Sequence, residues 1–170
     1  YKKETLKEYM SRADPPGKFE LGDINEQDFF VKPPYAFDRR YFTSDKPLVV
    51  FFEKRECHAC DILHTDPLND AQVKKLLKGF EVAQLDMNSD TPTITPEGEK
   101  LTAQQWAKKL NVFYSPTLVF FDKAGKEVLR VDSVVRLYRL RGVLDFIASE
   151  SYLEAPTFQR WRENLQEQGL

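Results

Sequence analysis

The order of apolar segments in this 170-residue chain predicts an α/β fold, with a central mixed sheet flanked by helices. The first observation is a continuous apolar run at residues 48–53, which is typical of a strand buried on both faces of a parallel sheet. The second is a pair of apolar segments at 118–121 and 127–131, whose connecting turn has glycine late in it and predicts an antiparallel hairpin. The third is a set of segments with helical spacing, placed between these strands.

Composition and charge fit one globular domain. Hydrophobic residues make up 41% of the chain and charged residues 31%, a balance that supports a packed core under a polar surface. The formal net charge of -2 gives no basic excess of the kind that nucleic-acid binding requires. No apolar run is long enough to span a membrane. Because the chain begins at Tyr1 without methionine, we expect that a signal peptide or anchor has been removed.

We expect residues 1–45 to form an N-terminal extension that packs on the main domain. A short amphipathic helix is predicted at residues 3–12, ended by an Asp-Pro-Pro-Gly sequence. Residues 18–45 hold many apolar and aromatic side chains without a steady period, and Pro33-Pro34 forbids a continuous helix. Aromatic side chains in this number require burial, which favours packing over a free tail.

The main domain, residues 46–150, is predicted to alternate helices and strands. After the strand at 48–53, the predicted elements are a helix from Cys57 to Pro67, a helix from Asp70 to Gly79, a strand at 80–87, a loop or small hairpin at 88–101, a helix from Thr102, the hairpin of 118–131, and a helix at 136–149. Asn69-Asp70 is predicted to cap the second of these helices, and Thr102 with Gln105 forms a predicted capping box. Residues 151–170 are predicted to form a C-terminal helical segment.

The residues suited to chemistry are Cys57 and Cys60, the only cysteines, spaced C-x-x-C where the buried strand passes into a helix. Cys57 lies at the helix start, where unpaired backbone N–H groups stabilise a thiolate. A lowered thiol pKa makes a cysteine nucleophilic near neutral pH. Cys60 lies one helical turn further on, close enough to attack a mixed disulfide and release the product. This arrangement predicts a redox site.

Other interpretations of the cysteine pair remain open. Structural zinc needs four ligands, whereas Cys57, Cys60 and His64 supply three and His58 lies between the cysteines. A c-type haem needs histidine directly after the second cysteine, where this chain has Asp61. A purely structural disulfide would close a short loop and stabilise the fold weakly. Redox chemistry without a cofactor or metal is our preferred hypothesis, and a binding module with a metal-binding or structural cysteine pair is the alternative.

With these residues in hand, the chain resembles thioredoxin-fold proteins over about residues 46–150. The signals are the C-x-x-C pair and the downstream Ser-Pro-Thr before a hairpin. Within that superfamily the chain resembles the exported SoxW-type group, through Phe52-Glu53, Glu97-Gly98, Leu101, Gln105-Trp106, Asn111-Val112 and the segment from Ser115 to Asp122. The resemblance implies a periplasmic thiol:disulfide oxidoreductase. Its substrate would be a protein or peptide disulfide or thiol, and its partner a membrane or soluble thiol reductant.

The resemblance also implies a role for Pro116, which would form a cis bond with Ser115 and face the cysteines. From its position alone, Pro116 is an ordinary trans proline at the start of a strand. A cis bond is uncommon, and here it would leave the Ser115 backbone free to pair with an extended substrate segment. The candidate substrate-binding residues are therefore Ser115, Pro116 and His58, the last of which lies between the cysteines.

Two features depart from the thioredoxin pattern: the buried acid and the cysteine motif. Thioredoxins keep a buried aspartate six residues before the first cysteine, and this chain has Phe51 there. Glu53 lies two residues later, on the same strand face and nearer the sulfurs. It either accepts the proton of the second cysteine as a general base or faces solvent at the strand end. Glu56 and His58 replace residues of the usual motif; a cationic His58 would favour the thiolate, and Glu56 would oppose it.

Overall fold

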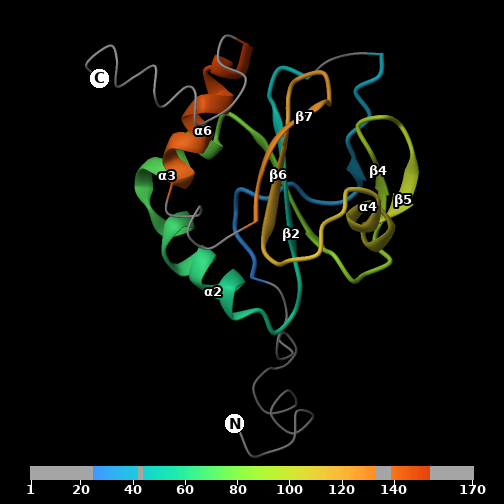
Figure 1. The fold of residues 1–170 in the computed structure, drawn as a ribbon, viewed down its shortest axis with the longest axis horizontal. Helices are drawn as coiled ribbons and strands as arrows, with labels where there is room; N and C mark the ends of the chain where they lie inside the picture. The colour runs from blue at the N-terminus through green and yellow to red at the C-terminus, as the bar shows by residue number, and fades with distance from the viewer. Residues whose placement is uncertain (1–24, 42–43, 133–138, 154–170) are drawn as a thin grey trace, which may run out of the picture.

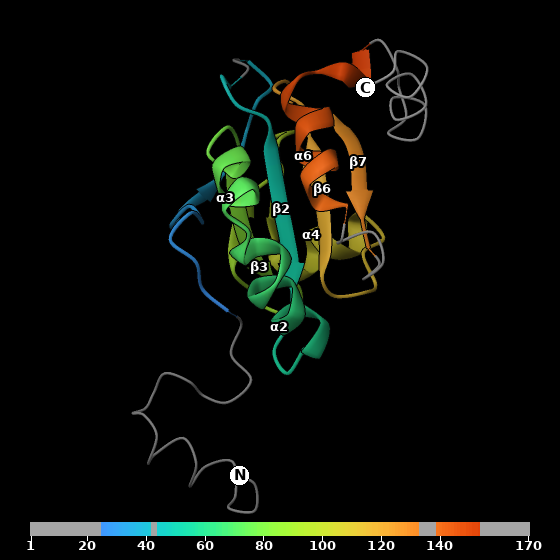
Figure 2. The ribbon, with the colours of Figure 1, turned by 90° about the vertical axis from the view of Figure 1, so that its left-hand side faces the viewer.

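A computed structural model describes residues 25–41, 44–132 and 139–153. The helix predicted at residues 3–12 and the C-terminal segment from residue 154 lie outside this described part. The described residues form two sheets with helices on both faces of the larger one (Figures 1 and 2). None of the helices in these three ranges is long and apolar enough to cross a membrane.

The larger sheet has the strand order β3-β2-β6-β7. Its strands are β2 (Leu48–Glu53), β3 (Glu81–Asp86), β6 (Thr117–Phe121) and β7 (Glu127–Val131). β2 pairs with β3 in parallel and with β6 antiparallel, and β6 pairs with β7 antiparallel. The predicted mixed sheet and the predicted hairpin are therefore confirmed.

Helices cover the two faces of this sheet unequally. One face carries α2 (His58–Thr65), α3 (Ala71–Leu77) and α6 (Leu140–Ala148), and the other carries α4 (Ala103–Lys109) (Figure 1). A one-turn 3-10 helix, Pro67–Asn69, joins α2 to α3. The prediction of a helix at 136–149 is confirmed for residues 140–148, while residues 133–138 are not described.

The core explains why β2 is apolar throughout. All six of its residues are buried, because helices pack on both faces of the strand. Val49 and Phe51 point into the cluster formed with α2, α3 and α6. Val50 and Phe52 point into the opposite cluster, where the Phe52 ring meets Trp106 of α4 edge-on at 5.6 Å between ring centroids.

Side-chain caps fix the starts of two helices. The Asp70 carboxylate accepts hydrogen bonds from the backbone N–H groups of Gln72 and Val73, which begins α3 as predicted. Thr102 and Gln105 form the predicted capping box: the Thr102 hydroxyl accepts from the Gln105 N–H at 3.1 Å, and the Gln105 side chain accepts from the Thr102 N–H at 2.9 Å.

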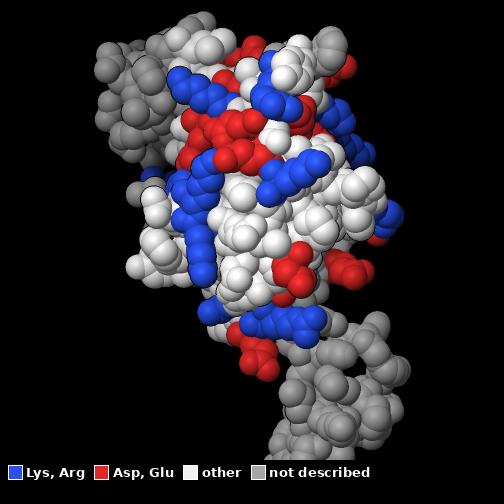
Figure 3. All heavy atoms as spheres, turned by 90° about the vertical axis from the view of Figure 1, so that its right-hand side faces the viewer, with Lys and Arg blue, Asp and Glu red and all other residues white. Residues whose placement is uncertain are grey.

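A second, smaller sheet lies beside α4. It contains β1 (Tyr35–Ala36), β4 (Pro92–Ile94) and β5 (Lys100–Thr102) in the order β1-β4-β5. The hairpin of β4 and β5 confirms the small hairpin proposed for residues 88–101. Sequence patterns did not predict β1, since a two-residue strand is too short to show a period. On this side of the molecule, uncharged residues form a band bordered by charged side chains (Figure 3).

The described part of the N-terminal segment lies against the main domain. The Phe30 ring meets Phe51 of β2 at 5.2 Å between centroids, and Phe37 is buried beside Trp106 at 5.9 Å. The Val31 N–H donates to the Val82 carbonyl at 2.8 Å. These contacts account for the aromatic content of a segment that has little regular secondary structure.

Candidate active site

The two cysteines lie at the start of α2 and are joined by a disulfide bond. Cys57 is the N-cap residue of α2, in an extended backbone conformation, and the Cys60 N–H donates to its sulfur at 3.1 Å. This is the predicted arrangement, in which an otherwise unpaired helix N–H stabilises negative charge on the first sulfur. The side chains differ in access: Cys57 is 8% exposed and Cys60 only 1%.

Ser115 is brought next to the cysteines by the loop that precedes β6. Its hydroxyl oxygen lies 3.2 Å from the Cys57 sulfur. A disulfide sulfur has no hydrogen to give, so the Ser115 hydroxyl donates. The Ser115–Pro116 peptide bond is cis. Thr117 then starts β6, with its hydroxyl donating to the Tyr114 carbonyl at 2.6 Å.

The side chains that flank Cys57 in the sequence are exposed. His58 is the first residue of α2, and Glu56 lies in the preceding turn. Glu56 has a φ of 54°, in the left-handed region that residues other than glycine seldom adopt. The structure thus places the His58 side chain at the surface, next to Cys57 in the chain.

Glu53 is fully buried, so the alternative in which it faces solvent is wrong. Its carboxylate accepts hydrogen bonds from Nε2 of His64 at 3.0 and 2.8 Å. Burial, as the main cause, raises the pKa of Glu53, while hydrogen bonds from His64 and Gln84 oppose that rise. Glu53 shares the sheet face of Phe51, as strand alternation predicted.

The contact of His64 with Glu53 was not predicted from the sequence. The sequence pattern indicated His64 only as a possible metal ligand. Its side chain is buried, and its Nδ1 lies 2.9 Å from the Gln27 side-chain nitrogen. With both ring nitrogens engaged, His64 is not oriented toward the sulfurs as a metal ligand. The sequence signal for this position was the four-residue spacing from Cys60, which puts both side chains on one face of the helix. Among the described residues, no group of three or more His, Cys, Asp or Glu side chains is arranged to hold a metal.

Two exposed aromatic residues also escaped the sequence analysis. Phe113 is 71% exposed and Tyr114 67% exposed, and they directly precede Ser115. Large exposed aromatic side chains are typical of surfaces that contact partners. Chemically, the site combines one accessible sulfur, one shielded sulfur, a hydroxyl donor and a buried carboxylate.

The chain is similar to several known proteins. A thioredoxin-like domain family model matches residues 39–148. The chain is similar to a thioredoxin-fold protein from Helicobacter pylori, with a TM-score of 0.63 and 17% identity, over 86% of this chain and 90% of that one. A thioredoxin from Thermus thermophilus is 31% identical over 58% of this chain and 73% of that one, with a TM-score of 0.43. No curated protein sequence matches the chain.

Proposed function

Because the chain belongs to the thioredoxin-like domain family, we propose that it is a thiol:disulfide oxidoreductase acting on protein or peptide disulfides. The observation that carries this proposal is the Cys57–Cys60 disulfide at the start of α2, with Cys57 the more exposed residue of the pair. A pair with one accessible and one shielded sulfur suits a two-step exchange, because an intermolecular bond forms at the first sulfur and an intramolecular bond replaces it.

In the first step, the reduced Cys57 thiolate attacks one sulfur of the substrate disulfide. A mixed disulfide forms, and the other substrate sulfur leaves with the electron pair and takes a proton from water. In the second step, Cys60 loses its proton to Glu53 and attacks the Cys57 sulfur. The Cys57–Cys60 bond forms, the second substrate thiolate leaves, and the substrate has gained two electrons.

The surroundings of Cys57 support substrate binding at this edge. The Ser115 hydroxyl donates to the Cys57 sulfur, which favours the anionic leaving group or nucleophile. The backbone next to Pro116 would pair with an extended segment of the substrate, as a strand pairs with a sheet edge. Phe113, Tyr114 and His58 would contact side chains on either side of the reacting cysteine.

Location and partner are proposed on the resemblance to the exported SoxW-type group. We place the protein in the periplasm, with a membrane or soluble thiol reductant that regenerates the dithiol. Fractionation of the native host tests the compartment. The reduction potential of the Cys57–Cys60 couple tests the direction of electron flow. A value of about -270 mV would match a reductant such as thioredoxin, and a value of about -120 mV would match a strong oxidant.

An insulin-reduction assay tests the activity itself, with dithiothreitol as the electron source. We expect turnover by the wild-type protein and none by Cys57→Ser. Metal content of the purified protein is measured beside it. Absence of turnover together with stoichiometric zinc would instead support a binding module whose cysteines hold a metal.

A further inference from the structure

A buried acid–base pair lies beneath the shielded cysteine. Cys60 and His64 are one turn apart on the buried face of α2, 1% and 6% exposed. Side chains on a helix lean toward its N-terminus, so the His64 ring covers the turn that carries Cys60. From there, its Nε2 donates to the carboxylate of Glu53 at the end of β2. The buried carboxylate at the end of β2 is therefore held by a histidine from the same helix as the resolving cysteine.

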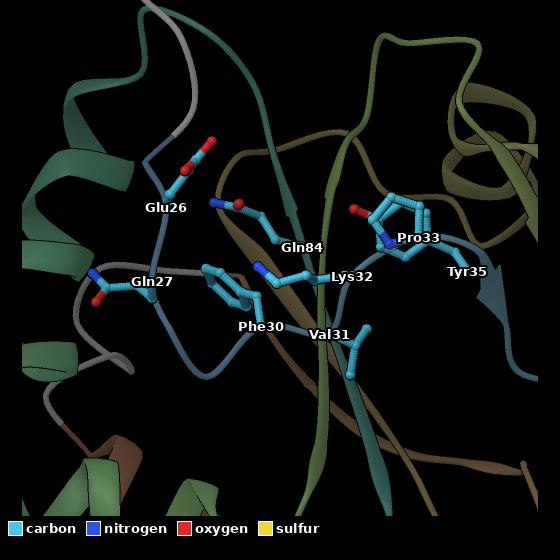
Figure 4. Close-up of a pocket in the computed structure, with 8 residues that line it drawn as sticks. All are labelled: Glu26, Gln27, Phe30, Val31, Lys32, Pro33, Tyr35 and Gln84. Carbon is cyan, nitrogen blue, oxygen red and sulfur yellow. The ribbon is translucent and has the colours of Figure 1, made fainter. Parts of the chain in front are cut away.

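This pair is connected to a cleft between the N-terminal segment and β3, with a volume of about 220 Å³ (Figure 4). Two of the residues that line the cleft also bind the pair. Gln27 lies 2.9 Å from Nδ1 of His64, and Gln84 hydrogen-bonds to Glu53 as well as to the Asn25 carbonyl. The cleft wall thus reaches the buried pair from both ends.

We propose that residues of this cleft wall hold the acid–base system of the redox site. Gln27 and Gln84 hold the His64–Glu53 pair, and Glu53 takes the proton of Cys60 and later releases it. His64 is a positioning residue that acts through Glu53. The inference rests on the proposed function and adds how its second step disposes of a proton.

The proton balance follows the resolving step. The Cys60 S–H bond breaks and its proton moves to the Glu53 carboxylate, while the Cys60 sulfur forms a bond to Cys57. The bond between Cys57 and the substrate breaks, and the substrate leaves as a thiolate with the electron pair. Glu53 then loses its proton to water, which restores the acceptor. A hydrogen bond from His64 favours the ionised carboxylate and so keeps Glu53 able to accept.

Other charged groups lie around the His64–Glu53 pair, on α2, on the N-terminal segment and at the ends of β2 and β3. Asp61 of α2 acts on Glu53 through space and raises its pKa. On the cleft side, Gln84 lies between Glu26 and Lys32 of the N-terminal segment in the view of Figure 4. Asp86, which pairs with Glu53 in the sheet register, lies 3.9 Å from Arg55. None of these groups makes the direct contact with Glu53 that His64 makes.

The test compares His64→Leu, His64→Gln and, as a control, Lys75→Gln, which changes an exposed side chain of α3 away from the cysteines. Stopped-flow kinetics with a peptide disulfide resolve formation and release of the mixed disulfide between pH 5.5 and 8.5. In His64→Leu, Glu53 should hold its proton to higher pH, so the rise of the release rate moves to higher pH. Each pH unit of movement means about tenfold slower release below the midpoint. His64→Gln keeps an amide donor and should follow the wild type, as should Lys75→Gln.

Two further variants test the cleft. Gln27→Leu removes the partner of Nδ1 and should move the release profile in the same direction as His64→Leu. Lys32→Met changes the same cleft wall without touching the pair and should leave the profile in place. Glu53→Gln removes the acceptor and sets the full size of the effect, about 100-fold on release. In all variants, the first attack by Cys57 should stay near the wild-type rate.

Infrared titration of the Glu53 carboxyl group in the oxidised protein needs no substrate. We expect Glu53 to titrate at higher pH in His64→Leu than in the wild type. Coincident titrations and release profiles for these two proteins would overturn the inference, even with insulin reduction intact. The wild-type protein could instead fail to reduce insulin while the Glu53 titration still moves to higher pH in His64→Leu. That result would reject the proposed function but would support the effect of His64 on Glu53.

Discussion

The Sγ atom of Cys57 lies 3.2 Å from the hydroxyl oxygen of Ser115, 58 residues further along the chain. Sheet register explains this proximity. β2 and β6 run antiparallel with Phe52 opposite Thr117, so the residues that follow β2 and those that precede β6 emerge at the same sheet edge. The cysteine pair and its polar neighbour are therefore positioned by the central strands, not by the loops alone.

We expect Ser115→Ala to slow alkylation of Cys57 in the reduced protein about tenfold at neutral pH, because a hydrogen bond to a charged group is worth about 1.5–3 kcal/mol. The measurement is the rate of iodoacetamide labelling of Cys57, followed by mass spectrometry. Ser149→Ala, at the end of α6, is the matched control and should leave the rate unchanged. An unaltered rate in Ser115→Ala would mean that the hydroxyl does not stabilise the thiolate.

The same labelling experiment on the wild type should modify Cys57 before Cys60. Cys57 is the helix cap and the more exposed sulfur, whereas Cys60 is 1% exposed and shielded in the first turn of α2. Peptide mapping after partial labelling identifies the site. Faster labelling of Cys60 would reverse the assigned roles of nucleophile and resolving thiol.

Cys60→Ser should trap mixed disulfides with substrates, and Cys57→Ser should not. Without the resolving thiol, the intermolecular disulfide lacks its fast intramolecular exit. Non-reducing electrophoresis of the two variants after exposure to a peptide disulfide makes the comparison. Equal trapping by both variants would show that the two sulfurs react alike.

Much of the fold could be predicted from local pattern. The two-sided burial of β2, the hairpin of β6 and β7, and the capping box at Thr102 all follow from short stretches of sequence, and the structure contains each of them. β1 could not be predicted, because its place depends on pairing with β4 some 58 residues away (Tyr35 with Thr93) and leaves no periodic signal. Pairings of this kind are set by tertiary packing.

The site was predictable for its sulfurs and less so for its acid–base groups. The C-x-x-C spacing and helix start identify Cys57 and Cys60 directly. Strand parity gave the face of Glu53 but left its burial open, because a glutamate at a strand end is usually solvated. Its burial depends on His64 from α2 and Gln27 from the N-terminal segment, two partners that only the folded chain brings together.

Gly125→Ala should destabilise the protein by about 2 kcal/mol, since a left-handed residue with a side chain costs about 1–2 kcal/mol and a clash adds to it. Gly125 has a φ of 93°, and a Cβ there would lie 2.7 Å from the Cβ of Pro96. Gly79→Ala is the control, because its new Cβ would meet only the Leu76 carbonyl oxygen, at 3.4 Å. Urea unfolding measures both; equal losses would remove the conformational explanation.

Glu53→Gln should make the protein more stable than the wild type at pH 8. Burial raises the pKa of Glu53 above its ordinary value of 4.5, so the folded state binds that proton more tightly than the unfolded state does. Below the unfolded-state pKa, both states carry the proton and no penalty exists. As the pH rises through the folded-state pKa, ionisation lowers the free energy of unfolding by about 1.4 kcal/mol for each unit of pKa difference.

A glutamine at position 53 carries no charge at any pH, yet its amide oxygen still accepts from Nε2 of His64. The stability gain of Glu53→Gln should therefore be absent below pH 4, grow as the pH rises toward the folded-state pKa, and be complete above it. Urea unfolding across pH 4–8 follows it, with the exposed Glu56→Gln as a control that should track the wild type. If Glu53→Gln were instead less stable at pH 8, the charge-assisted bond to His64 would outweigh desolvation, and Glu53 would be a poor proton acceptor for Cys60.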